Sequence, residues 1–201
     1  MSLKLKHLVL AILLVAPLTL LHGQFSIKVS VDAMRTSRAY LLEYIGTSPQ
    51  IIDSTTTKTP GQVEFTLPAD AHTGMYRLVI GPQQFLDFVF NQEDIELKTN
   101  YNAPRDSLKV LSSVENTLWS EYMNFFNQLS RKQENISSLM AVYKPTDPFY
   151  MELERELSRI QQIDPESLTR RIIAEHPDTY VARFLNVELS SEVPTGLSYA
   201  E

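Results

Sequence analysis

The sequence predicts an α+β protein, with an antiparallel β-sandwich-like domain first and a small bundle of three or four helices after it. Two observations carry this prediction. From Phe25 to about Ser112 apolar residues alternate with polar ones, which is the period of a half-buried strand; after Ser112 they recur at helical spacing. No helix-length segment separates the predicted strands, which argues against a parallel sheet with helical crossovers.

The strands are predicted from runs of five to eight residues separated by turns that contain Gly, Pro or Asn. Simple alternation marks some of them, whereas two denser apolar runs predict strands covered on both faces. Short strands at regular intervals favour a sandwich or a curled sheet. The alternating runs are 25–31, 63–67, 76–80 and 95–101, and the denser runs are 38–45 and 85–90.

The helices are predicted from their start signals. Ser112 and Glu115 fit a capping box at the first helix, and Asp147-Pro148 and Asp164-Pro165 each place a proline near a helix start. Pro177 breaks the pattern again before the last helical segment. Trp119 falls on the apolar stripe of the first helix, so the pattern predicts that it packs in the core and that its truncation to alanine costs about 3–5 kcal/mol.

The first 23 residues predict export. Two lysines, an apolar run of about 14 residues and a small, polar exit are typical of a cleaved secretory signal peptide. We therefore expect the protein in the periplasm or cell envelope, with membrane contact only through that peptide. The expected organisation is signal peptide 1–23, β domain 24–112, helical segment 113–189 and a linker or truncated C-terminus over 190–201.

Composition excludes several classes of function. The chain has no cysteine, so it has no disulfide, thiol nucleophile or thiolate metal site. Its formal net charge is −6, and it has no clustered basic footprint, which argues against nucleic-acid binding. His72 and His176 have no ligand-spaced partner, and no G-x-S-x-G elbow or glycine-rich phosphate loop is present. We therefore predict no catalytic, cofactor-binding or metal-binding residues and no cofactor.

Four residues are candidates for a ligand-facing surface. Asp87 interrupts an apolar strand, where it faces outward or is buried with a hydrogen-bond partner. Tyr40, Tyr44 and Tyr101 could serve as aromatic platforms for a sugar. A pair of carboxylates at glycosidase spacing would need a partner for Asp87 that the sequence does not identify.

Several passages resemble the N-terminal region of a bacterial family of secreted thioredoxin-like proteins. They are the hairpin from Ile51 to Phe65, the Gly74-Met75-Tyr76 strand, the 111–116 stretch that leads into the first helix, and the 175–182 corner. In that family a signal peptide, a β-rich module of unknown function and a helical segment precede a thioredoxin fold with a C-x-x-C motif. The resemblance covers most of the chain after the signal peptide, but no redox residue can be transferred from it.

The resemblance implies a non-catalytic exported accessory module of a thioredoxin-like protein, or a truncated gene product. Such a module would bind a protein partner, position it, or self-associate. A free-standing cell-envelope protein that binds carbohydrate or peptide is the alternative, and a carboxylate-dependent hydrolase is the second alternative.

Overall fold

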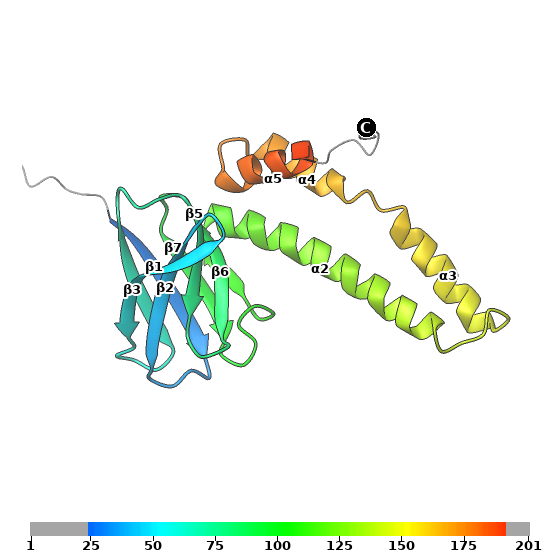
Figure 1. The fold of residues 1–201 in the computed structure, drawn as a ribbon, viewed down its shortest axis with the longest axis horizontal. Coiled ribbons are helices and arrows are strands. Elements are labelled where there is room, and N and C mark those ends of the chain that lie inside the picture. The colour runs from blue at the N-terminus through cyan, green and yellow to red at the C-terminus, as the bar shows by residue number, and fades with distance from the viewer. Residues whose placement is uncertain (1–23, 192–201) are drawn as a thin grey trace, which may run out of the picture.

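The computed structural model describes residues 24–191, which form a β-sandwich with a helical arm attached to one side (Figure 1). The two sheets have the strand orders β4-β1-β7-β8 and β3-β2-β5-β6. The predicted signal peptide and most of the predicted C-terminal linker lie outside the described residues. The strands are β1 (Gln24–Asp32), β2 (Arg38–Ile45), β3 (Ser48–Thr56), β4 (Gln62–Pro68), β5 (Gly74–Val79), β6 (Phe85–Phe90), β7 (Ile95–Asn100) and β8 (Lys109–Ser112).

The α+β class is confirmed, but the first sheet is mixed. Strand β1 lies between two partners: it pairs antiparallel with β4 and parallel with β7, so that Ile27 is opposite Ile95. The inward side chains of both sheets form one apolar core, which explains the alternation in the sequence. Its members include Ile27, Val29, Leu41, Phe65, Leu78, Phe88 and Leu97.

Strand β3 is not among the strands that alternation predicts. It is the edge of the second sheet, and nearly all its side chains are exposed, including Ile51 at 64%. Because neither face of β3 is buried, its sequence does not alternate between apolar and polar residues. A register irregularity between Leu41 and Leu42 of the neighbouring strand adds a bulge beside it, and bulges are one way in which proteins make an edge less open to further pairing.

The turn before β4 depends on a glycine. Gly61 has a φ of +74°, and a Cβ there would lie 2.5 Å from the carbonyl oxygen of Val31. The Val31 N–H donates to the Gly61 carbonyl oxygen at 2.7 Å, which joins the turn to the end of β1. Only glycine combines this backbone angle with this close approach.

Helix α2 (Val114–Met140) starts one residue later than the predicted capping box. Its N-cap is Ser113, whose hydroxyl oxygen accepts from the Asn116 N–H at 2.9 Å, while Ser112 is the last residue of β8. Glu115, predicted to cap this helix, instead accepts hydrogen bonds from the start of another helix. The capping-box pattern therefore predicts the position of the strand–helix junction to within one residue, but not which hydrogen bonds Ser112 and Glu115 make.

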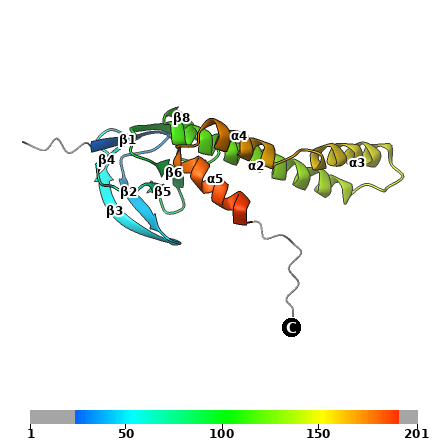
Figure 2. The ribbon, with the colours of Figure 1, turned by 90° about the horizontal axis from the view of Figure 1, so that it is seen from above.

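The remaining helices fold back along α2. They are α3 (Pro148–Gln161), α4 (Glu166–Glu175) and α5 (Tyr180–Ser191). Pro148 is in the first turn of α3, as predicted, and α5 extends two residues past the predicted end of the helical segment. Figure 2 shows α3 alongside the distal half of α2, and α4 and α5 near its proximal half.

The helices form two apolar clusters that are separate from the sandwich core. The proximal cluster joins Val89 of β6 to Leu118 of α2 and to side chains of α4 and α5. Val89 explains why the 85–90 run is dense, since this strand is covered on both faces at that end. The distal cluster consists of Ile136, Leu153 and Ile160, between α2 and α3.

Trp119 is half-buried and packs against the proximal cluster, so it is not the fully buried core residue that the apolar stripe predicts. Its ring stacks on Tyr122 with centroids 5.8 Å apart, and the Phe184 ring meets it edge-on at 5.7 Å. The side chain therefore forms part of a wall with one side open to a groove.

Candidate functional site

A groove of about 580 Å³ lies between the sandwich and α2. Strands β5 and β6 and the 105–108 loop form one wall, and residues 119–131 of α2 form the other. Each wall contributes both apolar and polar side chains. The lining residues are Met75, Leu86, Asp87, Arg105, Asp106, Leu108, Trp119, Ser120, Met123, Asn124, Asn127 and Arg131.

Helical spacing gives α2 a polar stripe. Ser120, Asn124, Asn127 and Arg131 follow one another at intervals of four, three and four residues, so α2 presents them along one stripe. At the far end the Arg131 guanidinium donates to the Asp106 carboxylate at 2.9 Å, and both side chains are about two-thirds exposed. This ion pair links the two walls of the groove.

Asp87 lines the groove as half of a two-point ion pair. The Arg77 Nε donates to Oδ1 at 2.6 Å and Nη2 donates to Oδ2 at 2.7 Å. The two residues are directly opposite each other in the β5–β6 hairpin. The Arg77 guanidinium also lies 3.8 Å from the centroid of the Phe85 ring, and its hydrogen bond to Asp87 raises its pKa. The guanidinium is therefore held in place by both its carboxylate partner and the ring.

The three tyrosine candidates do not form one cluster. Tyr44 lies beside the Arg77–Asp87 pair, with its ring centroid 5.3 Å from the guanidinium carbon; partial burial, and then the charge of Asp87, raise its pKa. Tyr40 and Tyr101 lie elsewhere, where they line a hollow of about 460 Å³ together with Arg38 and Pro82. All three rings are half-buried.

Asn116, which sequence reasoning missed, joins the groove's two walls at their base. Its side-chain amide donates to the Val89 carbonyl oxygen at 2.7 Å and accepts from the Val89 N–H at 2.8 Å. Because β6 is an edge strand, these two backbone groups have no strand partner on that side, and the amide replaces one. Asn116 is buried, so this is a fixed connection.

Glu115 makes the second connection and was also missed. Its buried carboxylate accepts from the N–H groups of Tyr180 and Val181 at 2.8 and 3.0 Å, at the start of α5. It also accepts from the Asn91 amide at 2.6 Å. A carboxylate at a helix N-terminus is favoured by the unpaired N–H groups and by the helix dipole.

Glu93 completes the junction. Its carboxylate accepts from the Ser113 hydroxyl at 2.5 Å and from the N–H groups of Val114 and Glu115 at 3.0 and 3.2 Å, at the start of α2. Two carboxylates from different segments thus cap two helices. The sequence shows polar residues at the junction, but their partners lie 20 or more residues away, so spacing could not identify these pairs.

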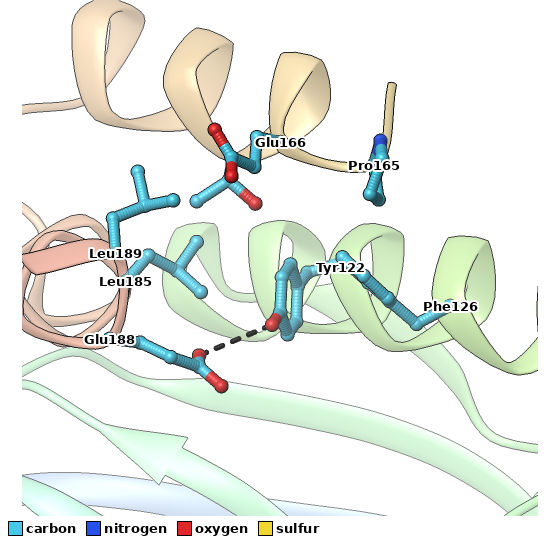
Figure 3. Close-up of a pocket in the computed structure, with 8 residues that line it drawn as sticks. Tyr122, Phe126, Pro165, Glu166, Leu185, Glu188 and Leu189 are labelled. Atoms are coloured by element: carbon cyan, nitrogen blue, oxygen red, sulfur yellow. Dashed lines mark hydrogen bonds between the residues drawn. The ribbon is translucent and has the colours of Figure 1, made fainter. Parts of the chain in front are cut away.

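A smaller hollow of about 170 Å³ separates α2 from α4 and α5 (Figure 3). The Tyr122 hydroxyl donates to Glu188 across it at 3.2 Å, and Phe126, Pro165 and Leu185 supply apolar walls. Burial, and then the charge of Glu188, raise the pKa of Tyr122 to about 12. The neutral phenol is therefore kept as the hydrogen-bond donor.

Residues 24–191 offer neither a metal-binding cluster nor a membrane-spanning helix. No three His, Asp or Glu side chains of this region converge in a way that could hold a metal ion. None of its helices combines the length and apolar character needed to cross a bilayer.

One family model matches the first part of the chain. Residues 25–119 match the family described as "Domain of unknown function (DUF4369)". None of the curated proteins matches the chain. The matched residues cover the sandwich except Gln24 and continue into α2 as far as Trp119, so they include Glu93, Glu115 and Asn116 as well as part of the groove.

Proposed function

We propose that the chain is a non-catalytic exported accessory module of a thioredoxin-like protein, and that its helical arm mediates self-association. The observation that carries this proposal is a group of exposed apolar side chains where α2 turns into α3. Figure 1 shows that this turn is the end of the arm farthest from the sandwich. We call residues 139–151, which join α2 to α3, the arm tip. Its exposed apolar side chains are Leu139, Val142, Tyr143, Phe149 and Met151.

The arm tip exposes several large apolar side chains to solvent. Val142 is 78% exposed, and the rings of Tyr143 and Phe149 pack edge-on at 5.0 Å, which leaves both partly open to solvent. A contiguous exposed group of this kind is typical of a protein contact surface. A second copy of the same chain is the simplest partner, because one self-complementary patch closes a two-fold dimer.

The base of the arm supports a positioning role. Asn116 fixes α2 to the edge of the sandwich, and Glu115 fixes α5 to the same point. Because both contacts are buried, the arm is held at a defined orientation to the sandwich. A domain attached to this module would therefore be presented at a defined place.

Sedimentation velocity on the purified protein tests this function. From low to high micromolar concentration we expect a shift from monomer to dimer. Val142→Ser combined with Phe149→Ser should abolish the shift, because it removes the apolar surface without touching buried residues. Val187→Ser is the matched control, since Val187 is 65% exposed on α5 and far from the tip in sequence. A monomer at every concentration would contradict the proposal.

A free-standing binding protein for carbohydrate or peptide is the second candidate. The hollow lined by Tyr40 and Tyr101 favours it, because two aromatic rings border a space large enough for a small ligand. Asp87 has both carboxylate oxygens bonded to Arg77, so nothing in the described geometry favours a carboxylate-dependent hydrolase over these two.

The second candidate predicts saturable binding of an oligosaccharide or peptide that is weakened by Tyr40→Ala. Tyr143→Ala, at the arm tip, is the control. Ligand-observed NMR against a panel of cell-wall glycans and short peptides would detect such binding. Equal signals from the two variants would remove the support that Tyr40 gives to this candidate.

A further inference from the structure

The groove between the sandwich and α2 combines features that suit a peptide. Met75, Met123 and Trp119 contribute apolar surface. Methionine side chains are flexible and polarisable, so they adapt to side chains of different shapes. The groove is less suited to a sugar, which would stack on the Trp119 ring. Tyr122 already stacks on that ring, and Phe184 contacts it edge-on.

The polar stripe of α2 suits an extended backbone. Asn124 and Asn127 lie one helical turn apart on α2, and Ser120 lies one turn before them. Each amide side chain carries both a donor and an acceptor. A peptide group also carries one N–H donor and one C=O acceptor, so such a stripe can pair with a chain that runs along the helix.

Among the charged residues that line the groove, Arg105 has no carboxylate partner. Asp87 is paired with Arg77, and Asp106 is paired with Arg131. Arg105 lies with its guanidinium 5.0 Å from the centroid of the Phe85 ring, and no carboxylate within residues 24–191 pairs with it. In a protein with a net charge of −6, an arginine that lacks a carboxylate at the rim of a groove is a docking point for an anion, and its planar fork matches a carboxylate.

We propose that this groove binds an extended peptide segment and that Arg105 receives a carboxylate of that peptide. The site deepens the partner-binding role proposed above, but it is separate from the arm tip. The carboxylate could be an acidic side chain or a free C-terminus, which present the same chemistry to the guanidinium.

Trp119 is the only tryptophan of the chain and lines the groove, so its fluorescence reports on binding. The purified protein is titrated with three leucine-containing pentapeptides. The first has a central glutamate and blocked ends, the second a free C-terminal carboxylate and no glutamate, and the third has a central glutamine and blocked ends. We expect a saturable emission change with at least one of the first two, and binding at least ten-fold weaker with the third.

Arg105→Gln should weaken the carboxylate peptide about ten-fold, because it removes a charged hydrogen bond. Lys132→Gln is the matched control: Lys132 is exposed on α2, next to Arg131, and does not line the groove. Both residues are exposed, so both variants should fold, which circular dichroism checks. Asn127→Ala provides a second test on the polar stripe.

The proposal is overturned if no peptide gives a saturable change, if the neutral peptide binds as tightly as the charged ones, or if Arg105→Gln binds like the control. It is also overturned if an acidic disaccharide saturates the signal and the peptides do not. Sedimentation of the same samples separates the two proposals. Peptide binding by a protein that stays monomeric would contradict only self-association at the arm tip. A dimer that binds no peptide would contradict only peptide binding in the groove.

Discussion

Asn116 shows how one side chain can define the connection between the sandwich and the arm. Its amide satisfies both backbone groups of Val89 at the open edge of the second sheet, and it also donates to the Ser113 hydroxyl at 2.7 Å. No other residue type of this size offers a donor and an acceptor in the same plane. The end of the sandwich and the beginning of the arm therefore depend on the same atoms.

Asn116→Ala should lower the free energy of unfolding by about 2–4 kcal/mol, because it leaves a buried N–H and a buried C=O without partners. Urea denaturation followed by circular dichroism measures this. Asn135→Ala, at an exposed position of the same helix, is the control and should change stability by no more than about 0.5 kcal/mol. Equal effects of the two substitutions would show that the Val89 contact contributes nothing.

The raised pKa of Tyr76 leads us to expect that the protein loses stability at alkaline pH. Burial, and then the charge of Glu43, raise its pKa to about 12 from the model-compound value of 10.0. The neutral phenol is thus favoured in the folded state, and its contribution is complete below pH 10 and is lost as the pH rises towards 12. We expect the free energy of unfolding to fall by about 2 kcal/mol or more across this window.

Tyr76→Phe should flatten that dependence. The variant loses the hydrogen bond from the Tyr76 hydroxyl to the His72 carbonyl oxygen, so it is less stable at neutral pH as well. Tyr122 titrates in the same window, so some slope remains. Denaturation curves at pH 9 and pH 11.5 measure the difference, and an unchanged slope in the variant would mean that ionisation of Tyr76 is not coupled to unfolding.

Trp119→Ala should cost less than the apolar stripe alone predicts. The side chain is half-buried and borders the groove, so its removal leaves a space that solvent can enter instead of a closed cavity. We expect about 2–3 kcal/mol, below the roughly 3–5 kcal/mol of a fully buried tryptophan. Urea denaturation gives the value, and a loss at the upper end would place Trp119 in a closed core.

At the scale of elements, α5 depends on Glu115. The carboxylate accepts from the first two N–H groups of this helix, whereas the Thr179 hydroxyl caps only the Ala182 N–H, at 3.1 Å. Glu115→Ala should therefore speed hydrogen exchange of the amides at Tyr180 and Val181 by at least about ten-fold, as expected for the loss of bonds to a charged group. Hydrogen exchange read by NMR measures both sites.

Glu121→Ala is the control for this experiment. Glu121 also lies on α2, but it is exposed and pairs with Arg171 at the surface. Exposed ion pairs contribute little to stability, so exchange at the start of α5 should be unchanged. A similar effect of both substitutions would show that general loss of negative charge, and not the cap, is responsible.

The sequence predicts those elements whose burial leaves a pattern. Strands β1, β2 and β4–β7 lie where apolar periodicity places them, and Pro148 marks the start of α3. Strand β3 is exposed on both faces and so has no periodicity. The parallel pairing of β1 with β7 could not be predicted, because alternation is the same for both directions.

The candidate site is less accessible from the sequence. One contact was within reach: a hairpin centred on the Gly81-Pro82 turn places Arg77 opposite Asp87. The partners of Glu115 lie 65 and 66 residues away, and nothing in local spacing indicates them. The groove itself arises from the angle between α2 and the sandwich, which depends on those contacts.

At the scale of the whole molecule, the three apolar clusters predict unequal stability. The distal cluster has only three buried members, Ile136, Leu153 and Ile160, whereas the sandwich core is much larger. Leu153→Ala should therefore speed amide exchange throughout α3 and the distal end of α2. Exchange in β1 and β7 should stay unchanged, because those strands share no buried residue with the distal cluster.

Leu78→Ala gives the opposite pattern. Leu78 is fully buried in the sandwich, so its truncation should lower global stability by about 2–5 kcal/mol and speed exchange in all the slowest amides. Mass spectrometry of both variants after hydrogen exchange tests the pair. Uniform loss of protection in Leu153→Ala would mean that the arm and the sandwich unfold together.

The position of β1 between β4 and β7 also constrains how the chain acquires its structure. Among the described residues, the first strand to be synthesised is a central one, and Ser26 at its start contacts Asp94 only across 68 residues. Closing so long a loop is entropically costly, so folding dominated by such pairings is slow. The alternating apolar segment of β1 therefore stays without its second neighbour until β7, which ends at Asn100, has left the ribosome.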